Sequence, residues 1–257
     1  MATLTIGVLG GMGPQATCDL FQKLIDATPA RSDQEHLHVI IDSNPAIPDR
    51  TAFLLGKGPD PTPALVESAC RLARAGCDFL IMPCNTAHYF VRQIEEAAGI
   101  PVLDMIEITA QAARQVLSPG DAAGLMATTG TIQSGLYHRA LARHGLQLIT
   151  PDEADQAEVM DIIYGPQGVK AGYRGQDLRA RARAVAERLV ARGARVVIAG
   201  CTEIPLVLAS GDISVPVLDS TGLLAQAAVA RARSGAEAGA GQGGVGVLDG
   251  KLTPDQN

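Results

Sequence analysis

Two cysteines in this 257-residue chain stand in surroundings that suit acid–base chemistry. Cys84 and Cys201 each come directly after a short apolar run, where a buried strand is expected to end. The carboxyl ends of parallel strands border the crevice in which α/β proteins bind their ligands. A thiolate at such a place can accept a proton, and a thiol can return one. The residues that follow the two cysteines are polar, namely Asn85, Thr86, Thr202 and Glu203.

An internal repeat relates the two cysteines to each other. Three pairs of segments align at nearly one spacing, and the offset is 117 residues for the first two pairs and 115 for the third. Such self-similarity predicts that the chain is a duplication of one α/β unit, with Cys84 equivalent to Cys201. The pairs are GCDFLIMPCNTA (76–87) with GARVVIAGCTEI (193–204), IGVLGGMG (6–13) with AGLMATTG (123–130), and IPVLD (100–104) with VPVLD (215–219).

Short apolar runs alternate with helix-length stretches along the chain. Two of these stretches, 64–76 and 178–193, predict helices, the second of which closes on the C-cap glycine Gly193. The alternation indicates right-handed βαβ units and therefore parallel sheets. The apolar runs predict buried strands over residues 5–9, 38–42, 79–82, 124–127, 146–150 and 196–199.

The predicted fold class is α/β, with two similar parallel-sheet domains related by a pseudo-twofold axis. We expect the active site in the cleft between the domains, with one cysteine sulfur on each side. The N-terminal lobe is predicted to comprise residues 1–105 plus 213–232, and the C-terminal lobe residues 106–212. The Gly/Ala-rich tail, residues 233–257, is predicted to be disordered because it carries few apolar anchors.

Two thiols on opposite faces of one small substrate suit a cofactor-independent racemase or epimerase. One thiolate would remove the proton on Cα while the other thiol delivers a proton from the opposite side. A helix N-terminus, expected after each cysteine, would lower the thiol pKa. The alternative is that both cysteines are small buried residues at tight turns. The other three cysteines have no counterpart in the repeat and are interpreted as structural: Cys18, Cys70 and Cys77.

The loop after the first predicted strand allows two interpretations. Its residues GMGPQA (11–16) match the G-x-G-x-x-A form of a dinucleotide-binding fingerprint, with Asp42 as the acid, farther along than is usual. In the second copy the loop becomes ATTGTIQS (127–134), which loses the fingerprint but keeps hydrogen-bond donors. We therefore favour two halves of one carboxylate cradle at helix N-termini. Its predicted members are Gly11, Met12, Thr128 and Thr129.

Composition excludes several classes of function. The net charge is −6 and no basic run is present, so neither nucleic acid nor an anionic membrane is an expected partner. The N-terminus lacks the basic region of a signal peptide, and no apolar stretch is long enough to span a bilayer. An odd number of cysteines argues against a disulfide framework. The protein is expected to be cytoplasmic, with a small molecule as its substrate.

The chain closely resembles the aspartate racemases of the cofactor-independent aspartate/glutamate racemase superfamily. The motifs that carry the resemblance are LGGMGP, NPAIPDRTA, MPCNTAH, GVKAG and GCTE. The resemblance implies that Cys84 and Cys201 are catalytic, that neither a metal nor an organic cofactor is needed, and that the enzyme is a homodimer. It also implies that Arg50 and Lys170 bind substrate carboxylates. Without it, both would be interpreted as exposed cations.

Two residues near the cysteines have open roles. Glu203 polarises Cys201, contacts the substrate ammonium, or is only a carboxylate favoured by a helix N-terminus. His88 lies one helical turn after Cys84 and is a candidate base for it, although the equivalent residue after Cys201 is Pro205.

The function predicted from these residues is interconversion of L- and D-aspartate. Alternatives within the superfamily are a racemase of another acidic amino acid such as glutamate, and an isomerase or hydantoin racemase of the same fold. A hydantoin would lack the second carboxylate that Arg50 and Lys170 would meet. An alternative of a different class is a non-catalytic protein that binds acidic amino acids, for which two cysteines are not required.

Overall fold

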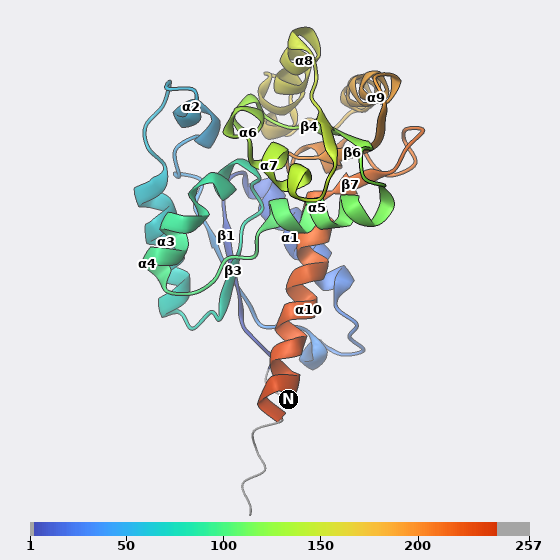
Figure 1. Cartoon of the computed structure of the whole chain (residues 1–257). Helices are drawn as coiled ribbons and strands as arrows, with labels where there is room; N and C mark the ends of the chain where they lie inside the picture. The colour runs from blue at the N-terminus through green and yellow to red at the C-terminus, as the bar shows by residue number, and fades with distance from the viewer. Residues whose placement is uncertain (1–2, 241–257) are drawn as a thin grey trace, which may run out of the picture.

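Two parallel β-sheets form the centre of the molecule, which a computed structural model describes for residues 3–240 (Figure 1). Sheet A has the strand order β2-β1-β3 and sheet B the order β5-β4-β6-β7. Every strand pair is parallel, as the alternation of strands and helices predicts. The strands are β1 (Ile6–Gly10), β2 (Val39–Ser43), β3 (Phe79–Ile81), β4 (Ala122–Met126), β5 (Gln147–Ile149), β6 (Ala194–Ala199) and β7 (Val217–Asp219).

The helices follow the same alternation. The predicted helices 64–76 and 178–193 are confirmed as α3 and α9, and Gly193 has the positive φ of 103° expected after a helix end. The α-helices are α1 (Pro14–Ala27), α2 (Arg50–Leu54), α3 (Thr62–Arg74), α4 (Val91–Ala98), α5 (Met105–Val116), α6 (Thr129–Ser134), α7 (Leu136–Arg143), α8 (Glu153–Tyr164), α9 (Gln176–Ala191) and α10 (Ser220–Ala240). Single 3₁₀ turns are η1 (Asp33–Glu35), η2 (Thr86–Phe90), η3 (Val169–Ala171) and η4 (Ile204–Leu206).

The repeat appears in the strand pairing. In the first half, Leu80 of β3 forms an isolated parallel bridge with Val102. In the second half, Val197 of β6 pairs with Val217 of β7. These are equivalent residues of the duplicated unit, so the predicted duplication into two parallel-sheet regions is confirmed.

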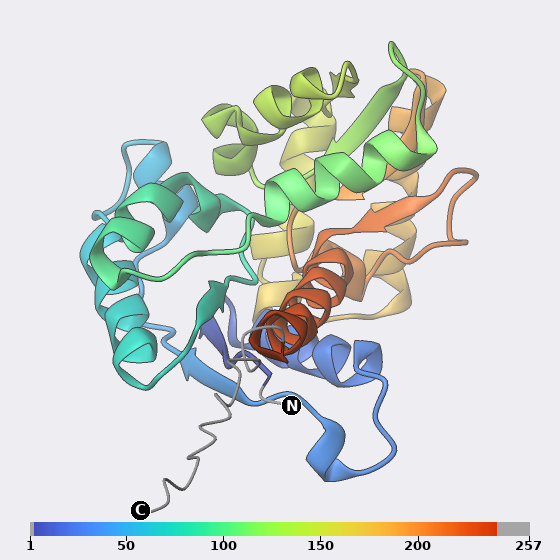
Figure 2. The ribbon, with the colours of Figure 1, turned by 60° about the horizontal axis from the view of Figure 1, so that its bottom comes forward.

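Each sheet has apolar side chains on both faces, which explains why its central strands, β1 and β4, are buried throughout. One face of sheet A packs against α3 and α4, and one face of sheet B packs against α8 and α9. The opposite face of sheet A is covered by α1 and α10, and the opposite face of sheet B by α5 and α7. Figure 2 shows α10 beside α1, close to the strands of sheet A.

The last helix of each repeat covers the sheet of the other repeat. Helix α5 follows the bridge at Val102, which extends sheet A, but α5 packs on sheet B. Helix α10 follows β7, a strand of sheet B, but packs on sheet A. The two helices also contact each other (Figure 1). The two halves therefore exchange their final helices.

This exchange bears on the lobe boundaries expected from the sequence, which stay a proposal. Strand β7 belongs to sheet B, whereas α10 joins sheet A. Helix α10 continues to Ala240 and so includes the first part of the tail that we predicted to be disordered. The Ala-rich composition favours a helix there, and Arg233 anchors the segment by donating a hydrogen bond to the Pro29 carbonyl. Residues 241–257 lie outside the described part of the chain.

None of the helices within residues 3–240 combines the length and the apolar character that a membrane crossing requires.

The turn from β1 into α1 requires glycine at position 11. Gly11 has a φ of 91°, and a Cβ atom there would overlap the backbone of Asn44. Its N–H donates to Thr17 Oγ1 at 2.9 Å, and Pro14 begins α1 as predicted. The need for glycine here is therefore conformational.

We expect Gly11→Ala to lower the free energy of unfolding by about 2–4 kcal/mol, because backbone strain and steric overlap add. Gly56→Ala is the matched control, since Gly56 also has a positive φ, 69°, but open space where the Cβ would be. Urea denaturation of both variants measures the difference. Equal losses in the two variants would show that the overlap with Asn44 contributes nothing.

Candidate active site

A small cavity between the two sheets gathers most of the residues predicted to act together. Its volume is about 10 Å³, which is room for about one water molecule. Both sulfurs and both predicted cations line it, and the side chains of Cys84, Cys201 and Arg50 are nearly inaccessible to solvent. The complete lining is Met12, Arg50, Thr51, Cys84, Asn85, Thr86, Thr128, Tyr164, Lys170, Cys201, Thr202 and Glu203.

Cys84 lies just beyond β3, in a turn fixed by backbone hydrogen bonds. Its N–H donates to the Met82 carbonyl at 2.9 Å, and its carbonyl accepts from His88 Nδ1 at 2.9 Å. His88 Nε2 accepts from the Met105 N–H at 3.1 Å, which assigns the ring proton to Nδ1. Both ring nitrogens are therefore bound to the backbone, and His88 does not line the cavity. It connects the Cys84 turn to α5 and is not placed as a base for the thiol.

Cys201 lies beyond β6, beside a carboxylate. Its Sγ donates to Glu203 Oε2 at 2.9 Å. Burial raises the pKa of the Cys201 thiol well above its ordinary value, and Glu203 raises it further, against the opposing charge of Lys170. The lowered pKa that we expected from a following helix is therefore wrong for Cys201. Only the 3₁₀ turn η4 follows, so there is no long helix dipole to stabilise a thiolate.

Arg50 begins α2 and reaches into the cavity from the first half of the chain. Its guanidinium donates to the Met12 carbonyl at 3.0 Å, the Pro48 carbonyl at 2.9 Å and the Ile47 carbonyl at 3.2 Å. Burial opposes its charge, but the Cys84 sulfur and a nearby carboxylate outweigh burial, so the pKa of Arg50 is raised. Its buried Nε has no hydrogen-bond partner among the described residues. One donor of a permanent cation is thus available for a ligand.

Lys170 enters the cavity from η3, in the second half of the chain. Its Nζ forms an ion pair with Glu203 Oε1 at 2.7 Å and also lies 3.4 Å from the Met12 carbonyl. Burial opposes its charge, but Glu203 and Cys201 outweigh burial and raise the pKa of Lys170. Lys170 therefore stays charged, with Glu203 as its partner. The cavity thus has a guanidinium beside Cys84 and a carboxylate beside Cys201.

A cluster of buried threonine hydroxyls joins the halves beneath the cavity. Thr128 caps the N-terminus of α6 by accepting from the Thr131 N–H at 3.2 Å. Its hydroxyl lies 3.0 Å from that of Thr51 and 3.1 Å from that of Thr86. Gly130 is part of the same contact, because a Cβ there would overlap Thr51. The cluster holds α2, η2 and α6 together and presents hydroxyl groups to the cavity.

A second buried network fixes Asn85 next to Cys84. Tyr137 Oη donates to Asn85 Oδ1 at 2.6 Å, and Asn85 Nδ2 donates to Ser220 Oγ at 3.2 Å. Ser220 Oγ in turn donates to the Ala199 carbonyl at 2.8 Å, at the end of β6. The turn of one cysteine is thus connected to the strand that carries the other.

Two of the predicted site residues do not reach the cavity. Gly11 uses its N–H within its own loop, and the loop presents the Met12 carbonyl, not N–H groups, to the cations. Thr129 accepts from Gln156 Nε2 at 3.2 Å and lies away from the cavity. The cradle that we expected from these two residues is not formed by them, because a carbonyl, not an amide, faces the cavity.

Two residues that line the cavity were not predicted as site residues from the sequence, namely Thr51 and Tyr164. Thr51 directly follows Arg50 in the motif that carried the resemblance, so its position was a usable indication. Tyr164 ends α8 and precedes the turn that carries Lys170, where nothing in the local pattern indicates a site residue. Among the residues with described positions, no three His, Cys, Asp or Glu side chains gather as a metal site would require.

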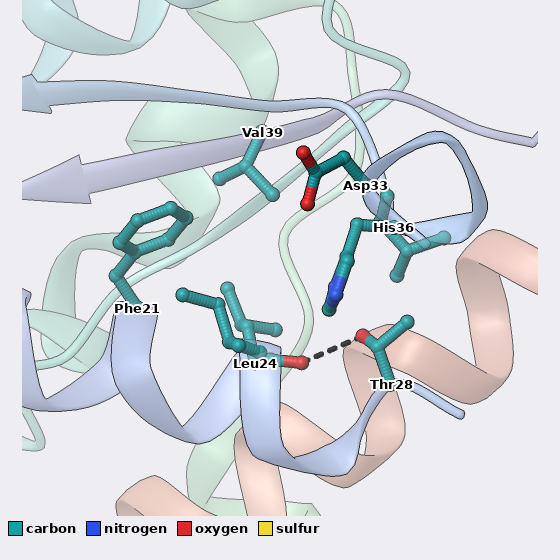
Figure 3. Close-up of a pocket in the computed structure, with 8 residues that line it drawn as sticks. Phe21, Leu24, Thr28, Asp33, His36 and Val39 are labelled. Atoms are coloured by element: carbon teal, nitrogen blue, oxygen red, sulfur yellow. Dashed lines mark hydrogen bonds between the residues drawn. The ribbon is translucent and has the colours of Figure 1, made fainter. Parts of the chain in front are cut away.

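A larger hollow, of about 330 Å³, lies between α1 and the segment 33–39 (Figure 3). Its walls are mostly apolar, and Phe21, Leu24 and Val39 are among them. Neither cysteine of the repeat lines it. Its size exceeds that of the cavity between the sheets, and Asp33 and His36 line it, but the two thiols of the repeat are both in the smaller cavity.

The Glu203 carboxylate gives a direct test of the Cys201 environment. In Glu203→Gln the negative charge is lost and Lys170 is left without its partner, so the pKa of Cys201 falls. A lower pKa means more thiolate at a given pH, and we expect the pH profile of Cys201 alkylation by iodoacetamide to move to lower pH. Peptide mass spectrometry measures the rate at each pH. Glu187→Gln is the control, because Glu187 makes a surface contact with Ser214. If the pH profile of Cys201 alkylation does not change in Glu203→Gln, the carboxylate does not govern the pKa of this thiol.

Comparisons with known proteins agree with this fold. A family model described as Asp/Glu/Hydantoin racemase matches residues 9–228. The broad specificity amino-acid racemase RacX of Bacillus subtilis (strain 168) is 30% identical over 231 residues, which cover 87% of this chain and 96% of that protein. The structure of the Picrophilus torridus aspartate racemase has a TM-score of 0.76 at 28% identity, covering 90% of this chain and 94% of that one. A glutamate racemase from Francisella tularensis, solved with D-glutamate, shares the fold with a TM-score of 0.64 at 18% identity, covering 92% and 83% of the two chains.

Proposed function

This chain belongs to the Asp/Glu/hydantoin racemase family, and we propose that it interconverts L- and D-aspartate by proton transfer at Cα between Cys84 and Cys201. The observation that carries the proposal is that one cavity contains both repeat-related thiols together with two cations, Arg50 and Lys170. Racemisation needs one acceptor and one donor of a proton on opposite sides of a carbon atom. Two thiols from two copies of one α/β unit supply such a pair.

The reaction balances without an oxidant or a reductant. One sulfur, as thiolate, takes the Cα proton, and the electron pair of the C–H bond moves into the α-carboxylate to give an enediolate. The other sulfur, as thiol, then protonates Cα on the opposite face. The hydrogen bond from Cys201 to Glu203 supports Cys201 as the thiol that donates the proton, with Cys84 removing it from one enantiomer, and the two roles reverse for the other enantiomer.

The cations and hydroxyl groups stabilise the charge that develops. A Cα–H bond is a weak acid, so donors aimed at the enediolate must supply much of the barrier reduction. The unpartnered Nε of Arg50 supports a role in holding one carboxylate of aspartate, and Lys170 would hold the other. Further donors to the α-carboxylate are proposed from Asn85, Thr86, Thr128 and Thr202, all of which line the cavity.

The substrate range has a second candidate. The similarity to a broad specificity amino-acid racemase favours turnover of amino acids besides aspartate. The ion pair between Lys170 and Glu203 supports this alternative, because it neutralises one of the two cations within the protein itself. Glutamate is the first further substrate to test. We extend the proposal to a cofactor-free homodimer, as the resemblance of the sequence implies, and keep the cytoplasmic location that was expected from the sequence pattern.

The test follows the Cα proton of L-aspartate by NMR in D₂O without added cofactor, alongside chiral chromatography of the product. Deuterium incorporation together with D-aspartate is the expected result, and L-glutamate and L-alanine run in parallel define the range. If the protein binds aspartate but neither exchanges nor inverts it, the racemase proposal fails and a binding protein is the better interpretation.

A further inference from the structure

Tyr164 lies at the junction of the cavity and the solvent. It lines the cavity, yet 38% of its surface is exposed, in contrast to the buried cysteines and Arg50. Its ring is 5.4 Å from Lys170 Nζ, a cation–π distance. Apart from Lys170, the other lining residues are buried, so this partly exposed ring forms a wall between the site and bulk water.

The hydroxyl of Tyr164 connects the two halves of the chain across this wall. Tyr164 ends α8, which packs on sheet B, and its Oη donates to Asp49 Oδ2 at 3.0 Å. Asp49 belongs to the first half, where its other oxygen caps α2 by accepting from the Ala52 N–H at 2.7 Å. Helix α2 begins with Arg50. One hydrogen bond therefore ties the helix carrying the guanidinium to the wall beside Lys170.

The size of the cavity means that part of its lining must move before a substrate can enter. A space with room for about one water molecule cannot admit an amino acid, which is several times larger. Opening must separate groups that now meet across the cleft, and the Tyr164–Asp49 bond is the one nearest the solvent. Thr51, Thr86 and Thr128 hold the deeper part of the cleft and are buried.

From these contacts we propose that Tyr164 has two roles. It is a gate that controls entry to the site, and it is a gauge that limits the length of the substrate side chain. Its bond to Asp49 must break to admit substrate, and its ring, held against Lys170, limits the length of the side chain that fits when the bond re-forms. Only the test of substrate preference depends on the proposed racemase function; the test of the gate does not.

Thiol accessibility tests the gate without reference to turnover. Iodoacetamide alkylation of Cys84 and Cys201, followed by peptide mass spectrometry, reports how often the cleft opens. We expect Tyr164→Phe to raise both rates about 5-fold, because one hydrogen bond that holds the closed state is lost. Asp49→Asn keeps the helix cap through its amide oxygen, and its Nδ2 can donate to Tyr164 Oη in place of the present bond, so the rates should stay near those of wild type.

Two controls make this result decisive. Tyr173→Phe removes a hydroxyl from a tyrosine that is 50% exposed and does not line the cavity, so it should change neither rate. Cys77 is buried beneath β1 and reports general unfolding within the same samples. Unchanged rates in Tyr164→Phe, or an equal acceleration of Cys77, would overturn the gate.

Substrate preference tests the gauge. In Tyr164→Ala we expect the ratio of kcat/KM for glutamate to that for aspartate to rise about 10-fold, since one methylene decides the fit. Tyr164→Phe keeps the ring and should leave the ratio as it is. An unchanged ratio in Tyr164→Ala would overturn the gauge. If the wild type racemises neither amino acid, the proposed function fails instead, and the alkylation rates still decide the gate.

Discussion

Serine in place of Cys84 or Cys201 is expected to reduce racemisation by about 10³-fold or more, since each thiol is needed either as acceptor or as donor. A serine hydroxyl is nearly isosteric with the thiol but far too weakly acidic to become an anion at neutral pH. Chiral chromatography of the product formed from L-aspartate measures the loss. Cys18→Ser is the control, because Cys18 is exposed and has no counterpart in the repeat.

Each single variant should retain one half of the reaction. In Cys84→Ser the thiol of Cys201 still faces one side of Cα, so it can remove a proton from one enantiomer and return a deuteron to the same face. We therefore expect exchange without inversion for one enantiomer in Cys84→Ser and for its mirror image in Cys201→Ser. NMR in D₂O with pure L- and D-aspartate separates the two. Racemisation within 10-fold of wild type in either variant would show that its thiol is not an obligatory proton carrier.

Arg50→Lys is expected to lower kcat/KM roughly 10²-fold. Lysine keeps the charge but replaces a fixed fork of donors by one flexible ammonium group, and a lost hydrogen bond between charged partners corresponds to one or two powers of ten. Stability should fall as well, by about 1–3 kcal/mol, because buried carbonyls of Met12 and Pro48 lose their donor.

Separate measurements distinguish these two effects. Urea denaturation gives the free energy of unfolding, and kinetics on the folded fraction give kcat and KM. Arg71→Lys is the matched control, at an exposed ion pair with Asp42, and should alter neither quantity appreciably. If Arg50→Lys loses stability while kcat/KM is unchanged, Arg50 is a structural cation that only ties the loops together.

Much of the fold follows from the sequence because parallel strands buried on both faces have a distinctive apolar pattern. The strands around Val8 and Ile198, and the helix ending before Gly193, lie within a few residues of their predicted bounds. The offset between repeats also predicts that Cys84 and Cys201 occupy equivalent places. These features depend on local periodicity and turn residues, which a single sequence displays.

What the sequence could not predict depends on contacts between distant residues. Tyr164 becomes a site residue only because α8 ends opposite Asp49, 115 positions earlier in the chain. The direction of the Cys201 pKa was mistaken because it depends on burial and on Glu203, whose rotamer no pattern shows. We expected the N–H groups of the Gly11 loop to face the cavity. The Gly11 N–H instead donates to Thr17, because the direction of the backbone in a turn depends on its hydrogen-bond partner.

The exchange of the final helices has a consequence for how the chain folds. Two sheets joined by a linker would ordinarily be two folding units, each able to form alone. Here sheet A lacks one of its coverings until α10 has been added, and sheet B lacks one until α5 has been placed. Each half exposes apolar surface until the other has assembled, so the stabilities of the halves are not independent. The molecule is therefore expected to gain its stability cooperatively, as one unit.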